Sequence, residues 1–262
     1  MSGVVEVGRF AGGSILSIVC ITYQRYRLLE ECIQSYLEQD YQGPSEMVVV
    51  NDSPLVSYSL PSQIGNTSTW AGKAGWTKQI AIINHPTRFP NIGRKLEYAF
   101  NQCQGTHVYR IDDDDLLMPN ALTETAKMIE ARPYADVVRS SNFHLFGNNK
   151  YERLSDGINN GNVFSRSYLQ RVVWPDTSAD EDLSLVFKDG VNQYTAPNTA
   201  TMIYRWRGDS THISNHLHLP SEERLNFMPT TESGHIVLNP HFDHNYYDQI
   251  YNSFISSINN DR

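Results

Sequence analysis

In the first half of the chain, short apolar runs alternate with segments of helical periodicity. The apolar runs have the length and composition of buried strands, and they lie at residues 15–21, 47–50, 79–84 and 107–111. Between them, residues 28–37 and 93–104 repeat apolar side chains at helical spacing. Strands that alternate with helices predict a mostly parallel sheet with right-handed crossovers. Ligands of such a sheet gather at the carboxyl ends of its strands.

The remaining elements are predicted with less regular patterns. Pro119 opens a helix that runs to about Ala131, because proline is tolerated in a first helical turn. Residues 53–78 are predicted to form a loop. Two further strands are expected at 135–139 and 200–206, and further helices at 164–172, 181–188 and 246–258. We expect one α/β unit in two halves, 14–120 and 121–212, followed by a polar, His-rich extension at 213–262.

Charge and cysteine content exclude several classes of protein. The 262 residues carry a formal net charge of -8, which disfavours nucleic acid as a partner because a phosphate backbone is held by clustered Lys and Arg. The three cysteines, Cys20, Cys32 and Cys103, stand singly in apolar segments and predict buried thiols. No apolar stretch reaches the roughly 20 residues of a spanning helix. We therefore expect no integral membrane segment and a cytoplasmic protein.

Four consecutive aspartates, Asp112 to Asp115, follow the strand that ends at Ile111. Adjacent carboxylates repel one another, and a hard divalent cation relieves that repulsion by taking their oxygens as ligands. An acidic run can also be a solvated turn. Its position at the ligand edge of an α/β sheet favours a cation, either Mn²⁺ or Mg²⁺.

Other carboxylates and an aromatic side chain also stand at positions where ligands are expected. Asp52 follows the second strand and Tyr23 follows the first. A ring and a carboxylate acceptor together suit a nucleobase, although Asp-Ser-Pro after a strand is also a common turn. Glu181 and Asp182 begin a predicted helix, where they are either a base held ionised by the helix dipole or simple capping residues.

These segments, taken in order, resemble the family-2 glycosyltransferases of the GT-A fold. The matching motifs are SIVCITYQR at 17–25, VVVNDS at 48–53, Asn91-Ile92-Gly93, the segment from Ile111 to Pro119, NGNVFSR at 160–166 and EDLSL at 181–185. The resemblance covers residues 14–212. It implies a Rossmann-like sheet flanked by helices, with a donor-binding first half and an acceptor-binding second half.

The resemblance also implies roles for single residues. Thr22, Tyr23 and Asp52 would bind the nucleotide, with the ring of Tyr23 on the base and the carboxylate of Asp52 accepting a base N–H. Asp114 would be a direct metal ligand, and Asp112 would lie nearer the ribose and share the metal. Asp113 is grouped with the nucleotide-binding positions, although Asp113 and Asp115 either support the site from behind or point away from it.

The second half would supply the base and further contacts to the donor. Asp182 matches the position of the catalytic base, with Glu181 as the alternative. His212 would complete the metal shell or meet the diphosphate, and Arg94, with Lys95 beside it, would contact the diphosphate at a helix start. The alternative is that these three basic side chains are surface residues, His212 in the His-rich tail and the other two on the exposed face of a helix.

The sequence thus predicts a metal-dependent, inverting glycosyltransferase. It would move a sugar from a nucleotide-sugar, with UDP favoured over dTDP or GDP, to a hydroxyl of a glycan or another acceptor. Departures from the commoner motif at Ile21, Gln24 and Asn51 bear on nucleotide preference. Two alternatives stay open: a sugar nucleotidyltransferase, and a non-catalytic carbohydrate- or nucleotide-binding protein of the same fold.

Overall fold

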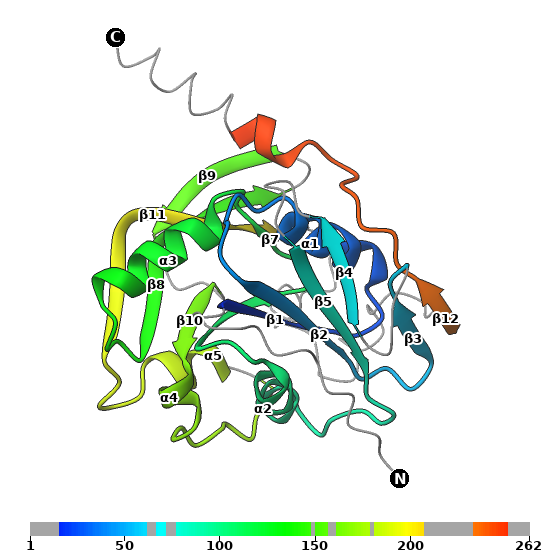
Figure 1. The fold of residues 1–262 in the computed structure, drawn as a ribbon, viewed down its shortest axis with the longest axis horizontal. Coiled ribbons are helices and arrows are strands. Elements are labelled where there is room, and N and C mark those ends of the chain that lie inside the picture. Colours follow the sequence, from blue (N-terminus) through cyan, green and yellow to red (C-terminus); the bar gives the residue numbers. More distant parts are fainter. Residues whose placement is uncertain are drawn as a thin grey trace, which may run out of the picture.

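A computed structural model describes residues 16–61, 67–71, 77–147, 150–156, 161–178, 181–206 and 233–250. At 67–71, 77, 147, 150–156, 181–183 and 206 it describes the backbone without side chains. The predicted α/β fold is confirmed: a large curled sheet lies between two layers of helices (Figure 1).

Four parallel strands form the centre of the sheet in the order β5-β2-β1-β6. Their bounds are β1 Leu16–Thr22, β2 Ser45–Asn51, β5 Thr77–Asn84 and β6 His107–Asp112. Further strands extend the sheet on both sides, so that the whole order is β4-β5-β2-β1-β6-β10-β8-β11-β7, with β9 beside β8. These added pairs are antiparallel except for β8 with β11. The sequence therefore predicted the parallel centre, whereas the pairing beyond β6 is mixed.

Both faces of the central strands are apolar, which is typical of strands buried between two helical layers. Along β1, Ile18 and Cys20 point to the core beneath α1 (Tyr26–Leu37), and Val19 points to the opposite core. Helix α3 (Ala121–Ala131) covers the same face as α1. The opposite face is covered by α2 (Ile92–Gln102), α4 (Arg166–Leu169) and α5 (Glu181–Val186) (Figure 1).

Two predictions for local structure were wrong. The segment 53–78, predicted as a loop, contains β3 (Val56–Ser59) and β4 (Thr67–Ala71). The side chain of Asn84 forms hydrogen bonds with the backbone of β3. Its amide nitrogen donates to Tyr58 O at 2.8 Å, and its oxygen accepts from Tyr58 N. The segment 164–172, predicted as a helix, begins instead with β10 (Asn162–Ser165) and continues into the short helix α4.

The strands of the second half are longer than their apolar cores predict. Strand β8 spans Val137–Gly147 and β11 spans Gln193–Trp206, against predictions of 135–139 and 200–206. They pair in parallel with two register irregularities, and β9 (Lys150–Asp156) extends β8 on its other side. The two-residue strand β7 (Leu116–Leu117) pairs with β11. Helix α3 begins at Ala121, two residues after Pro119.

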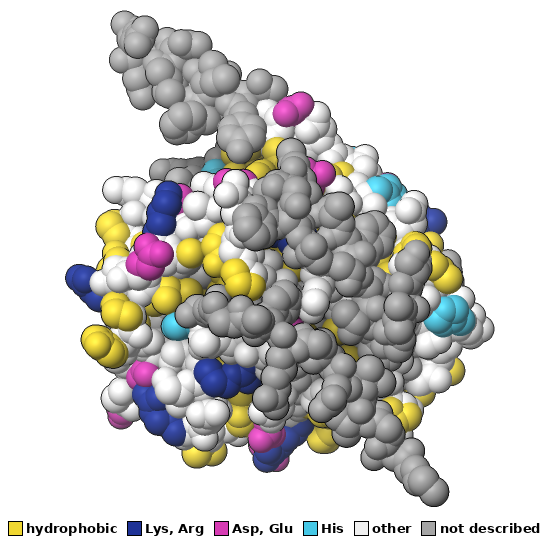
Figure 2. Space-filling model, viewed as in Figure 1, with side chains coloured by type: hydrophobic (Ala, Val, Ile, Leu, Met, Phe, Trp, Pro, Cys, Tyr) yellow, Lys and Arg dark blue, Asp and Glu magenta, His cyan; other side chains and the backbone are white. Residues whose placement is uncertain are grey.

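The C-terminal segment returns to the first half of the molecule. Strand β12 (Gly234–Val237) pairs in parallel with β3, and Figure 1 shows the following chain running past α1 to a helical turn at 246–250. Leu238, Tyr246 and Ile250 are buried in the same core as α1. Residues 233–250 are thus part of the folded unit. Figure 2 shows hydrophobic side chains scattered among polar ones on the described part of one face.

Candidate active site

The strand order reverses between β1 and β6, which lie side by side at the centre of the sheet. From β1 the chain passes through α1 to β2 on one side, and β6 lies on the other side of β1. The carboxyl ends of β1 and β6 meet where Ile21 is paired with Asp112. Such a switch point is where open α/β sheets bind ligands.

The run of four aspartates forms a turn at this point. Asp112 ends β6, and the turn is closed by a hydrogen bond from Asp115 N to Asp112 O at 3.1 Å. The chain then enters β7, where Leu116 pairs with Ile203 of β11. The pairing of β7 with β11 therefore fixes the far end of the turn.

Three of the four carboxylates converge. Asp112, Asp114 and Asp115 each place one oxygen so that the three atoms lie within 4.8 Å of one another. Asp114 and Asp115 are buried, and Oδ2 of Asp115 has no hydrogen-bond partner among the described residues. Burial first, and then the charges of Asp114 and Asp112, raise the pKa of Asp115 well above its usual value. A divalent cation bound by oxygens would satisfy the orphaned atom and neutralise the cluster, so these residues fit such an ion.

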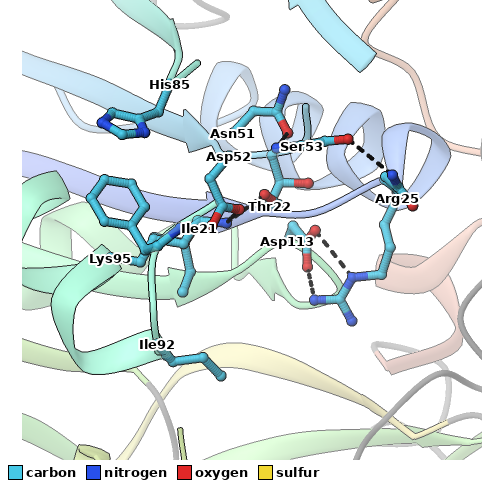
Figure 3. A network of polar contacts seen from close by, with 12 residues as sticks. Ile21, Thr22, Arg25, Asn51, Asp52, Ser53, His85, Ile92, Lys95 and Asp113 are labelled. Carbon is cyan, nitrogen blue, oxygen red and sulfur yellow. Dashed lines mark hydrogen bonds and ion pairs between the residues drawn. The ribbon is translucent and has the colours of Figure 1, made fainter. Parts of the chain in front are cut away.

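Two arginines offset part of the negative charge of the turn. The guanidinium of Arg25 bridges Asp113 and Asp114, with 2.8 Å between its Nη1 and Oδ2 of Asp114, and Arg110 Nη2 lies 3.1 Å from Asp112 Oδ1. Figure 3 shows Arg25 reaching Asp113 from the start of α1. Burial raises the pKa of Asp113 to about 6, and Arg25 opposes that shift. When all four carboxylates are ionised, Arg25 and Arg110 offset two of the four negative charges, and a divalent cation would neutralise the other two.

The predicted metal ligands are thus brought together in part. Asp112 and Asp114 belong to the convergent set, whereas His212 lies outside the described residues. Asp115 joins the set, although sequence reasoning placed it behind the site or pointing away. The sequence indicated the site through the acidic run as a whole. Only the structure shows which three of the four carboxylates converge.

Asp52, predicted to read the base, is held by a buried lysine. Lys95 Nζ forms an ion pair with Asp52 Oδ1 and donates to Thr22 O at 2.6 Å, and Phe89 N donates to Asp52 Oδ2 at 3.0 Å. Figure 3 shows Lys95 between the ends of β1 and β2. Lys95 is 5% exposed, so it is neither a surface charge nor open to a diphosphate. Burial lowers the pKa of Lys95, and Asp52 opposes the shift.

Tyr23, predicted to stack on a base, lies half-buried beneath a cation. The Arg88 guanidinium carbon is 4.6 Å from the centre of the Tyr23 ring. Arg88 belongs to the loop after β5, and sequence reasoning did not single it out because an isolated arginine in a loop carries no pattern. Tyr23 follows the end of β1, Asp52 follows β2 and Arg88 lies in the loop after β5.

The N-terminus of α2, which contains Arg94, is bonded to the segment before the Glu181-Asp182 motif. Gly93 N donates to Thr177 O at 2.9 Å, and the side chain of Asn91 caps the helix by accepting from Arg94 N at 2.9 Å. Asp176 accepts from the Asn91 side chain at 2.7 Å and from Arg94 Nε at 3.2 Å. The predicted contact of Arg94 with a diphosphate stays a prediction, and in this structure its guanidinium lies on acidic neighbours.

Glu181 and Asp182 begin helix α5, as predicted. Their side chains lie outside the described part of the structure. The C-terminal end of α5 is held in the core, because Leu185 and Val186 are fully buried and Tyr168 Oη donates to Leu185 O at 2.6 Å. The role of Asp182 as base therefore stays a prediction.

A family model for glycosyl transferase family 2 matches residues 17–193. The chain belongs to this family. The matched range contains β1 except its first residue, the aspartate turn, and the Glu181-Asp182 motif, so the resemblance drawn from the motifs is confirmed.

Solved structures of S. aureus TarS have a similar fold. TarS 1-349 matches with a TM-score of 0.51 at 17% identity over 72% of this chain and 60% of that one. The same protein in complex with UDP matches with a TM-score of 0.52 at 16% identity, over 74% and 61%. Its complex with UDP-GlcNAc matches with a TM-score of 0.52 at 15% identity, over 73% and 58%. This chain thus spans about 60% of the length of TarS 1-349.

Among the described residues, no helix combines the length and the apolar composition needed to cross a bilayer.

Proposed function

We propose that this chain transfers a sugar from a nucleotide-sugar, with UDP as the favoured nucleotide, to a hydroxyl group of a glycan or a similar acceptor. The reaction depends on Mn²⁺ or Mg²⁺ and inverts the anomeric configuration. The observation that carries the proposal is the convergence of Asp112, Asp114 and Asp115 at the switch point of the sheet, in a member of glycosyl transferase family 2.

The ends of β1 and β2 support a pyrimidine donor. Asp52 is fixed by Lys95 and by Phe89 N, and each carboxylate oxygen keeps a further lone pair with which to accept N3–H of uracil. Tyr23 offers its ring to the base, and Arg88 lies over that ring. Crystal structures of TarS in complex with UDP and with UDP-GlcNAc have the same fold, which supports a uridine nucleotide here.

The cation site supports departure of the diphosphate. When bound, a divalent cation supplies the positive charge that a diphosphate leaving group requires. Asp114 and Asp112 would hold it, with Asp115 as a third oxygen donor and His212 as a further ligand. Asp113 stays on Arg25 and keeps the turn in shape, and Arg94 contacts the diphosphate from the start of α2.

Asp182 acts as the base on the acceptor side. Helix α5 begins at Glu181, and the amide groups of a first helical turn favour the ionised form of a carboxylate. It takes the proton of the acceptor hydroxyl as that oxygen attacks the anomeric carbon from the face opposite the diphosphate. Glu181 is the alternative base.

A nucleotide-sugar panel tests the proposal. Calorimetry should show UDP binding that strengthens when Mn²⁺ replaces a chelator, and UDP-sugars should be turned over slowly to UDP in the absence of acceptor. Equal UDP affinity with chelator and with Mn²⁺ would contradict the metal site. Tight GDP binding without UDP or dTDP binding would overturn the choice of nucleotide, and binding without any turnover would favour a non-catalytic protein.

A further inference from the structure

Arg205 is a fully buried arginine that contacts the aspartate turn through its backbone and its side chain. It stands near the end of β11, just beyond the residues that pair with β7. Its amide donates to Asp115 Oδ1 at 3.0 Å, and its Nε donates to the main-chain oxygen of Asp114. Arg205 therefore fixes two proposed cation ligands: its side chain holds the backbone of Asp114, and its backbone amide holds the carboxylate of Asp115.

The outer side of the Arg205 guanidinium is held by Glu31 of α1 and Tyr246 of the C-terminal segment. Nη1 of Arg205 forms an ion pair with Glu31 Oε2 and lies 3.3 Å from Tyr246 Oη. Tyr246 Oη donates to Glu31 Oε1 at 2.9 Å, and Asp243 N donates to the same oxygen at 3.0 Å. Arg205, Glu31 and Tyr246 are each at most 2% exposed.

We propose that Arg205 is a positioning residue of the cation site, and that Tyr246 and Glu31 hold it in place, which makes the C-terminal segment part of the site's support. The inference rests on the cation site of the proposed function. Groups that hydrogen-bond to a metal-ligating residue fix the orientation of that residue, and they change metal affinity without contacting the ion themselves. Asp115 is the clearest instance: Arg205 N occupies its Oδ1, and its Oδ2 is the buried oxygen without a described hydrogen-bond partner.

Charge explains why Glu31 is needed. A guanidinium beside the aspartate turn would repel a divalent cation if its charge stood alone, because interactions between buried charges are weakly screened. The ion pair with Glu31 neutralises Arg205, so that the arginine can orient the turn without opposing the cation. Removing the negative charge of Glu31 should therefore weaken cation binding more than the loss of one hydrogen bond would.

A pair of Tyr-to-Phe variants separates positioning from general stability. Tyr246→Phe removes only the hydroxyl that contacts Glu31 and Arg205. Tyr36→Phe is the matched control, because Tyr36 is fully buried on the same helix as Glu31 and its hydroxyl bonds to Ser45 Oγ at 3.2 Å, away from the aspartate turn. Mn²⁺ is titrated into each protein, alone and with UDP, and the free ion is followed by electron paramagnetic resonance.

Tyr246→Phe should raise the Mn²⁺ dissociation constant about 3-fold or more, and Glu31→Gln on the order of 10-fold, whereas Tyr36→Phe should leave it unchanged. Comparable melting temperatures for the two Tyr variants, with unequal Mn²⁺ affinity, would support positioning. Wild-type Mn²⁺ affinity in both Tyr246→Phe and Glu31→Gln would overturn this inference and leave the proposed function standing. Absence of saturable Mn²⁺ binding in the wild type would overturn the cation site itself.

Discussion

At the scale of single residues, the chemistry of the acceptor side depends on Asp182. Replacing its carboxylate by an amide in Asp182→Asn keeps a hydrogen-bond acceptor at the start of α5 but removes the base. We expect kcat to fall ~100-fold or more, with UDP affinity and the melting temperature near those of the wild type. Glu181→Gln is the matched control at the neighbouring position. If Glu181→Gln loses the activity and Asp182→Asn keeps it, the two roles are exchanged.

Lys95 and Arg94 are adjacent cations with opposite environments, and they make a second test at this scale. Lys95→Met leaves Asp52 buried without its cation, and we expect the free energy of unfolding to fall by about 3 kcal/mol. Arg94→Met should change it by less than about 0.5 kcal/mol, because the Arg94 side chain is 43% exposed. Urea titration measures both values. Equal losses would mean that the ion pair of Lys95 with Asp52 contributes nothing.

The ion pair of Lys95 with Asp52 also has a direct cross-check. In the double variant Lys95→Met, Asp52→Asn neither charge of the pair is left buried, so part of the lost stability should return. A double variant that is less stable than Lys95→Met alone would show that Asp52 is stabilised by other groups.

At the scale of elements, α2 and the segment before α5 form one unit that depends on Gly93. A methyl group at this position would overlap the main-chain oxygen of Pro175, and Gly93 N already bonds to Thr177 O. Backbone contacts of this kind cannot be relieved by a side-chain rotation. We expect Gly93→Ala to displace residues 175–178, to lower the free energy of unfolding by about 1–3 kcal/mol and to lower kcat.

The control for Gly93 is a glycine without such a neighbour. Gly190 has a positive φ but nothing within 4 Å of an added Cβ, so that Gly190→Ala tests backbone strain without steric overlap. If Gly93→Ala keeps kcat while losing stability, the link between α2 and the Glu181-Asp182 motif is structural only.

The sequence predicted elements well where a single pattern decides them. Strands β1 and β2 are apolar on both faces, and Leu96 and Phe100 of α2, with Cys103 just after the helix, are buried as their spacing predicts. Strand β3 was missed because its partners are distant in the sequence: it pairs with β12, and the side chain of Asn84 bonds to Tyr58 from 26 residues away, so that no local pattern reports these contacts. The helix predicted at 164–172 was too long, because Ser165 is both the last residue of β10 and the cap of α4.

The candidate site could likewise be predicted only in part. Its location at Asp112 to Asp115 follows from the order of strand and acidic run. The contacts that shape it do not, because Lys95, Arg25 and Arg205 come from distant elements and the sequence does not show which carboxylates they meet. Their roles depend on burial, which only the fold decides.

At the scale of the whole molecule, stability depends on pH through buried charges, and Lys78 is the clearest case outside the site. Its side chain is 1% exposed, its Nζ donates to Tyr41 O at 3.3 Å, and the same atom lies 5.3 Å from the centre of the Tyr36 ring. Burial lowers the pKa of Lys78 to about 8, and Asp40 opposes the shift. The charged ammonium therefore lowers the free energy of unfolding at neutral pH.

The sign of the pH dependence follows from proton binding. Between about pH 8 and 10.5 the unfolded chain keeps the proton on Lys78 while the folded protein releases it, so this group makes the free energy of unfolding rise with pH. Lys78→Met keeps an apolar side chain and removes the charge. We expect the variant to be more stable than the wild type by about 1–3 kcal/mol at pH 7. That advantage should shrink as pH rises through this range and be nearly lost at its upper end.

Urea unfolding at several pH values from 7 to 10.5 measures the difference between the two proteins, in which groups common to both cancel. Lys127→Met is the control, because Lys127 is an exposed lysine paired with Glu124 on the surface of α3. Its variant should show no comparable gain at pH 7. A gain for Lys78→Met that stays constant up to pH 10.5 would mean that the improvement comes from packing alone. In that case Lys78 would keep its proton in the folded protein, and the contacts with Tyr41 O and the Tyr36 ring would be sufficient to hold the ammonium in the core.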